Sequence, residues 1–154
     1  MQSISELKPA ENTRKVAIVY GVMIAVGHIA YFWAAWLLGF LHITELRVLN
    51  VLIQGAGIYF ALKAFRKTQQ GSLNYFRAMT VGFIASVIGT IIFAVLLFFV
   101  FQLDHGLFES IMRYEPMGRY LTVYMACFAV VVEGAISGTF VTYLLMNWMN
   151  TDRV

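Results

Sequence analysis

Glu133 is the residue of this chain whose surroundings most constrain its chemistry. It stands inside a long apolar run, residues 120–148, that holds no other Asp, Glu, Lys or Arg. A carboxylate near the middle of a membrane span costs about 2.5–3.5 kcal/mol on insertion scales, so a nearby group must offset that cost. His28 stands inside another such run, and a carboxyl group and an imidazole together could relay protons across a membrane.

Three interpretations of Glu133 follow from this position. In the first, Glu133 and His28 form a proton or ion relay. In the second, a protonated Glu133 is structural and donates a hydrogen bond to a neighbouring helix, which contributes about 0.6–2 kcal/mol. In the third, Glu133 faces a partner protein. All three stay open at this point, because a single sequence does not define how a helix is rotated about its axis.

Four further polar residues could join Glu133 in one cluster at the middle of the membrane. With a rise of about 1.5 Å per residue, each lies roughly midway through a bilayer core of about 30 Å. Asn50 and Gln54 are four residues apart and share one helix face, as do Glu133 and Ser137. The predicted midplane cluster, whose pairings the sequence does not define, is Glu133, His28, Asn50, Gln54 and Ser137.

Small residues form a second pattern that bears on helix packing. Gly134-x-x-x-Gly138 lies directly after Glu133, and Gly82 and Ser86 repeat the interval of four in another apolar run, with Gly89 beside them. This spacing lets two helix backbones approach closely. The pattern fits packing inside one bundle, and it also fits association of two copies of the chain.

The elements that must position these residues are transmembrane helices. Of the 154 residues, 60% are hydrophobic and 12% are charged, whereas a soluble domain carries about 25% charged residues. A span needs about 20 apolar residues, and runs that are apolar on all sides predict helices rather than barrel strands. We therefore predict an all-α membrane protein, a bundle of four helices within one domain at 16–150, with spans at about 16–40, 46–65, 78–103 and 120–148.

The distribution of Lys and Arg predicts the orientation. Eight of the eleven lie in the first 15 residues, the loop after the second span and the C-terminal end, and three lie in the other two loops. Because basic residues favour the inner side, both termini are expected in the cytoplasm, with residues 1–15 as a cytoplasmic tail. The basic loop residues Lys63, Arg66, Lys67 and Arg77 set this topology, and they could also attract anionic head groups.

The outer loop at 102–119 is compatible with a short amphipathic helix, which could lie on the membrane surface or cap the helix ends. No phosphate loop, paired-histidine or CxxC motif occurs, so no enzyme activity, metal or cofactor is predicted. Two small groups in loops on the outer side contain residue types that bind metals, although scattered histidines are usually ordinary polar loop residues: His42 with Glu45, and Asp104 with His105 and Glu109.

One stretch resembles a known family of small bacterial membrane proteins, the domain of unknown function DUF4199. The resemblance rests on Gly57-Ile58, Phe65-Arg66-Lys67, Gly71-Ser72-Leu73, Tyr75-Phe76-Arg77-Ala78, Gly82 and Gly134-Ala135-Ile136-Ser137. It implies four spans and a bacterial envelope, which together with the helical spans indicates the inner membrane. The resemblance implies no activity and no catalytic residue.

The expected function is that of a non-catalytic accessory or scaffold subunit, bound to a protein partner or to itself within the bilayer. This expectation follows from a chain that is nearly all membrane span and has no catalytic motif. The alternative is a small proton-coupled transporter or channel that uses Glu133 and His28. Since the basic residues flank apolar runs, they are explained by topology, and no nucleic-acid partner is expected.

Overall fold

Helices account for nearly all of the structure. The computed structural model describes residues 4–39, 48–69, 74–114 and 118–151. Along the chain these form α1 (Ile4–Leu37), α2 (Val48–Thr68), α3 (Tyr75–Leu103), α4 (His105–Met112), the 3-10 turn η2 (Gly118–Tyr120) and α5 (Val123–Thr151). Four of the helices are long and apolar enough to cross a membrane. The prediction of an all-α protein with four transmembrane helices is confirmed.

The helix ends differ from the sequence-based ranges in two informative places. α1 begins at Ile4, so residues 4–15 of the segment expected to be a cytoplasmic tail are helical. Adding residues to an existing helix needs no new nucleus, and the long apolar part of α1 supplies one. The last span begins at Val123 because η2 occupies Gly118–Tyr120.

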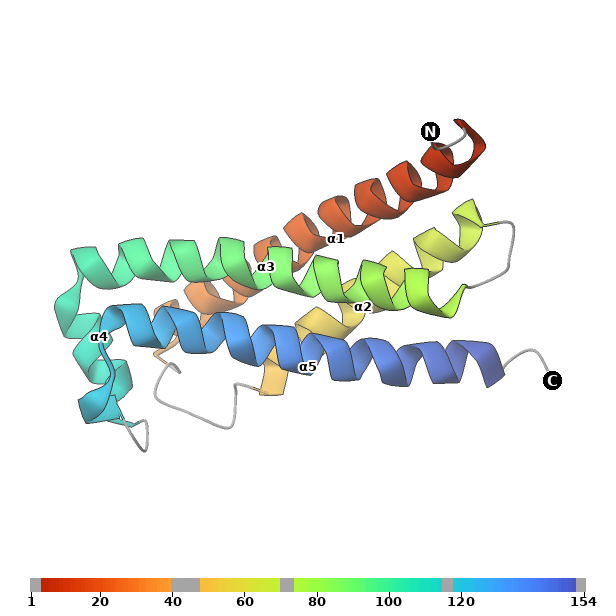
Figure 1. Ribbon diagram of the computed structural model, residues 1–154. Helices are drawn as coiled ribbons and strands as arrows, with labels where there is room; N and C mark the ends of the chain where they lie inside the picture. Colours follow the sequence, from red (N-terminus) through yellow and green to blue (C-terminus); the bar gives the residue numbers. More distant parts are fainter. Residues whose placement is uncertain (1–3, 40–47, 70–73, 115–117, 152–154) are drawn as a thin grey trace.

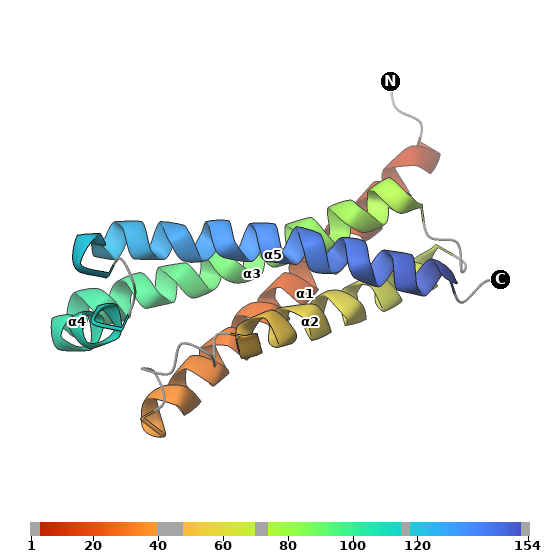
Figure 2. The same cartoon turned by 90° about the horizontal axis from the view of Figure 1, so that it is seen from below.

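The four long helices run alternately in opposite directions, so both chain ends lie at the same end of the bundle (Figure 1). α3 lies at the centre and packs against α1, α2 and α5, while α2 also packs against α1 and α5. Figure 2 shows that the first turns of α1 diverge from the other helices. α2 and α5 run in the same direction, and α1 packs directly against both α3 and α2.

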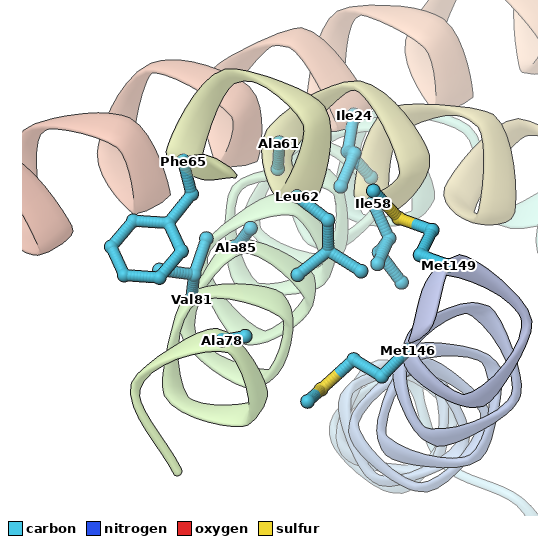
Figure 3. Close-up of a cluster of buried hydrophobic side chains, with 10 residues drawn as sticks. All are labelled: Ile24, Ile58, Ala61, Leu62, Phe65, Ala78, Val81, Ala85, Met146 and Met149. Atoms are coloured by element: carbon cyan, nitrogen blue, oxygen red, sulfur yellow. The ribbon is translucent and has the colours of Figure 1, made fainter. Parts of the chain in front are cut away.

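Two apolar clusters fill the interior, one towards each end of the bundle. The cluster near the chain ends brings side chains from α1, α2, α3 and α5 together around Phe65, Leu62 and Met146 (Figure 3). The opposite cluster centres on Phe93 and Phe101 and lies between α1 and α3. Buried polar side chains from α1, α2 and α3 lie between the two clusters along these helices: His28, Gln54, Ser86 and Thr90.

α4 lies at the end of the bundle that is remote from the chain ends, where it packs against α3 and η2. Its Leu107, Phe108 and Ile111 pack against the second apolar cluster, so its apolar side contacts the helix ends. Asp104 ends α3 and also caps α4, since its side chain accepts a hydrogen bond from the Leu107 N–H at 2.9 Å. A short helix, His105–Met112, therefore lies within the loop that is compatible with one.

Candidate functional site

The backbones of α3 and α5 approach closely along a row of small side chains, called here the small-residue seam. Each glycine of one helix meets a hydroxyl residue of the other: Gly134 meets Thr90, Gly138 meets Ser86, and Gly82 meets Thr142. A Cβ atom added at any of the three glycines would overlap the facing side chain. The intervals of four seen in the sequence are thus occupied inside one bundle, where they set the distance between α3 and α5.

Gln54 of α2 reaches into this seam and links three helices. Its Nε2 donates to Ser86 Oγ of α3 at 2.9 Å and to the Gly134 carbonyl of α5 at 2.7 Å. Its Oε1 accepts a hydrogen bond from Ser137 Oγ of α5 at 3.3 Å. Both amide hydrogens and the carbonyl oxygen of Gln54 therefore have partners, although the side chain is only 3% exposed.

The two threonine hydroxyl groups of the seam are satisfied by their own helices. Thr90 Oγ1 donates to the Ser86 carbonyl at 2.9 Å, and Thr142 Oγ1 donates to the Gly138 carbonyl at 2.6 Å. Such bonds to the residue four positions earlier let a threonine face an apolar surface without leaving an unpaired donor. Gln54 and its partners Ser86, Gly134 and Ser137 are called here the Gln54 layer. Because its polar groups are hydrogen-bonded, this layer can pack in hydrocarbon.

His28 and Asn50 form a separate contact between α1 and α2. The imidazole Nε2 lies 3.2 Å from the backbone carbonyl oxygen of Asn50. The His28 ring is 3% exposed and lies against Phe93 of α3, with ring centroids 5.3 Å apart. His28 thus lies in the bundle interior, next to the Gln54 layer but outside its hydrogen bonds.

Glu133 differs from these residues in its exposure. Its side chain is exposed on α5, although it makes an interaction within the chain. The five residues of the predicted midplane cluster therefore separate into three parts. Gln54 and Ser137 are bonded to each other, His28 and Asn50 are in contact, and Glu133 lies on the outside of the bundle.

Further glycines at helix crossings were not identified from the sequence as packing positions. Gly21 of α1 lies against Ile88, and Gly57 of α2 lies against Ile24. Gly89, which was singled out, also lies against Ile24. Gly21 and Gly57 could have been found by the interval of four between small residues that marks the seam. Gly21 precedes Ala25 by four residues, and Gly57 precedes Ala61 by four.

The basic loop residues lie where α2 ends and α3 begins. Arg66 and Lys67 are in the last turn of α2, where cations interact favourably with the helix dipole. Lys63 lies over the ring of Tyr59, with its Nζ 5.8 Å from the centroid. Arg77 is in the first turn of α3, and its backbone N–H donates to Asn74 Oδ1 at 3.3 Å.

Of the candidate metal ligands, Asp104 and His105 have other partners, and two more fall outside the described residues. Asp104 caps α4, and His105 Nδ1 donates to the Phe101 carbonyl at 2.9 Å. His42 and Glu45 lie outside the described residues. Within residues 4–39, 48–69, 74–114 and 118–151, no three His, Cys, Asp or Glu side chains gather as a metal site would require.

Comparison with known proteins identifies the family. A family model described as "Protein of unknown function (DUF4199)" matches residues 15–116, about two thirds of the chain. The chain belongs to this family. The DUF4199 match includes α2, α3 and α4 and ends before α5, so Gly134-Ala135-Ile136-Ser137 lies outside it. No curated protein and no solved structure matches the chain.

The small-residue seam predicts opposite outcomes for two Gly→Ala substitutions. Gly138→Ala places a methyl group against Ser86 and Gln54 and should lower the free energy of unfolding by about 1–3 kcal/mol. Gly55→Ala is the matched control, because its new Cβ would lie an ordinary 3.5 Å from Val141 Cγ1. It should be neutral or stabilising by up to about 1 kcal/mol through helix propensity.

Reversible unfolding in mixed micelles, followed by circular dichroism, measures both values. Equal stability of the two variants would show that α3 and α5 do not approach as closely as the seam requires.

Proposed function

We propose that this DUF4199 protein is a non-catalytic accessory or scaffold subunit that binds another membrane protein through α5. The observation that carries this proposal is how little of α5 the other helices cover. Of the residues in its most apolar stretch 17% are buried, against 28% in α2, 33% in α1 and 39% in α3. A long apolar helix with so much free surface offers room for a further transmembrane helix.

The uncovered side of α5 has the spacing of a helix–helix interface. Six exposed residues of α5 follow one another at intervals of four and three positions in turn. They are called here the outer face of α5: Ala129, Glu133, Ile136, Phe140, Tyr143 and Asn147. Glu133 and Asn147 are two heptads apart and occupy the same position of this repeat. Polar residues repeated at one heptad position fix register between helices.

Charge identifies the kind of partner that would fit this face. An exposed carboxyl group in the apolar span is costly even with an interaction inside the chain. A partner helix that offers a cation or a hydrogen-bond donor at this depth would reduce the cost. Outside the candidate spans, the described residues form the first turns of α1, the short helix α4 and the turn η2.

Photocrosslinking in native membranes should identify this partner. A crosslinking amino acid at Ile136, which is 66% exposed on the outer face, should capture a stoichiometric membrane protein. The matched control is Val26, which is 59% exposed on α1 and should not capture it. Glu133→Leu should reduce co-purification in mild detergent while the bundle stays folded, and Glu133→Gln should retain more of the partner because it keeps a polar side chain.

Equal capture from both positions, or a monomer without any stoichiometric partner, would overturn the proposal. A crosslinked product of twice the chain mass would instead identify a second copy as the occupant of α5.

We also propose that the end of the bundle with both chain ends faces the cytoplasm of a bacterial inner membrane. Exposed cations at that end come from three helices: Arg14, Lys15, Lys63, Lys67 and Arg77. At the opposite end, the described charged residues Asp104, Glu109 and Arg113 are mixed in sign. Basic residues favour the cytoplasmic side during insertion, which supports this orientation.

Reporter fusions test the orientation directly. A fusion after the C-terminus should be active as a cytoplasmic reporter, and one inserted beside Glu109 of α4 should be active as a periplasmic reporter. A periplasmic signal from the C-terminal fusion would show that the protein is inverted.

A small proton-coupled transporter or channel is the second candidate function. It is favoured by His28, an ionisable side chain that is buried halfway along a span. If the protein conducts protons, His28→Gln should abolish flux in proteoliposomes, since glutamine cannot change charge, and Glu133→Gln should reduce it. Wild-type flux no greater than that of empty liposomes would eliminate this candidate.

A further inference from the structure

The exposed side of α2 changes from apolar to cationic along the helix. Five exposed residues follow one another at intervals of four or three positions, so they lie on one side of α2. They are called here the α2 lipid face: Leu52, Ala56, Phe60, Lys63 and Lys67. The two lysines lie towards the end of α2 that is near both chain ends, and the apolar residues lie deeper in the span. The face therefore matches a phospholipid in polarity, with cations at head-group level and apolar side chains at the level of the acyl chains.

Both lysines can reach the head groups of the lipid leaflet at this end of the bundle. α2 ends at Thr68, directly after Lys67, and Lys63 lies about 8 Å further in at a rise of about 1.5 Å per residue. A lysine near the end of a span extends its apolar stem along the helix and places its ammonium group at the membrane surface. The two ammonium groups therefore lie at the level of lipid phosphates.

Aromatic rings from two helices position the Lys63 ammonium. Its Nζ lies over the ring of Tyr59, 5.8 Å from the centroid, and this ring lies against Trp148 of α5, with centroids 6.1 Å apart. Trp148 is 57% exposed and directly precedes the end of the last span at Met149. Tyrosine and tryptophan rings prefer this interfacial level of a membrane. The contact with Tyr59 is a cation–π attraction, so ammonium hydrogens of Lys63 stay available to an anion.

Charge determines which lipid fits this face. Lys63 and Lys67 are four positions apart on α2, where like charges repel each other, and an anion between them would offset that repulsion. Each ammonium group has three donors and phosphate oxygens are acceptors. A zwitterionic head group brings a cation of its own, which the two lysines would repel. A head group of net negative charge therefore complements the face better.

We propose that the α2 lipid face binds one anionic phospholipid, whose phosphate lies at Lys63 and Lys67. The acyl chain of this lipid lies along the apolar part of the face, where Phe60 is 50% and Leu52 is 60% exposed. Setting the topology requires cations only during insertion, whereas this site persists in the folded protein. It involves neither Glu133 nor the outer face of α5, so it goes beyond the proposed scaffold role.

Quenching of Trp148 fluorescence by brominated lipids tests the site where it lies. Trp33→Phe and Trp36→Phe leave Trp148 as the single tryptophan of the full chain. The protein is reconstituted into mixed vesicles of phosphatidylcholine and phosphatidylglycerol, in which one or the other lipid carries bromine on its acyl chains. The dependence of quenching on lipid fraction gives the relative affinity, and phosphatidylglycerol should bind at least about fivefold more strongly.

Two double variants distinguish the α2 lipid face from the general basic charge of this end. Lys63→Gln with Lys67→Gln should remove the preference for phosphatidylglycerol, whereas Lys63→Arg with Lys67→Arg should retain it. The matched control is Arg14→Gln with Lys15→Gln, which removes the same charge from exposed positions of α1 near the same end and should leave the preference unchanged.

Equal quenching by the two brominated lipids in the protein with both lysines would overturn the proposal, and this comparison depends on no lysine variant. An equal loss of preference in the α1 and α2 double Gln variants would also overturn it, because net charge rather than the α2 lipid face would then attract the lipid. An undiminished preference without Lys63 and Lys67 would have the same consequence.

Discussion

The close approach of α3 and α5 along the small-residue seam is the contact on which the interior of this protein depends. Gln54 can bond Ser86 of α3 and the Gly134 carbonyl of α5 at once only because those two backbones are near each other. Larger residues at the seam glycines would separate α3 from α5, and the side-chain amide of Gln54 would then lose a hydrogen-bond partner on one of these helices. In hydrocarbon such a loss is not repaired by solvent, so side-chain size at the seam controls the hydrogen bonds.

The Gln54 layer also explains how four apolar helices keep one register. Lipid is as apolar as the helix surfaces, so apolar packing alone gives little preference for one vertical offset over another. The Gln54 hydrogen bonds and the alternation of glycine with hydroxyl residues exist at one offset only. The apolar clusters on either side, around Phe65 and Phe93, then pack in the register that the layer defines.

The sequence predicts the spans and the composition of the site better than its pairings. Long uncharged runs and intervals of four residues are local properties, so four helices and the residues of the seam could be recognised in advance. Pairing depends on how each helix is rotated, and that rotation is a tertiary property. For this reason Gln54 and Ser137 could be placed at one depth but not paired. The exposure of Glu133, one residue before the buried Gly134, could not be foreseen either.

Glu133 and Gln54 show two different solutions for a polar side chain in a span. Gln54 lies inside, where hydroxyl groups and a backbone carbonyl of the bundle satisfy its amide completely. Glu133, which directly precedes Gly134 in α5, lies on the exposed side of that helix and makes its own interaction within the chain. The bundle can therefore keep its register whatever occupies the outer face of α5. In such an arrangement, selection on a binding surface can change the outer face while the seam that holds the fold stays the same.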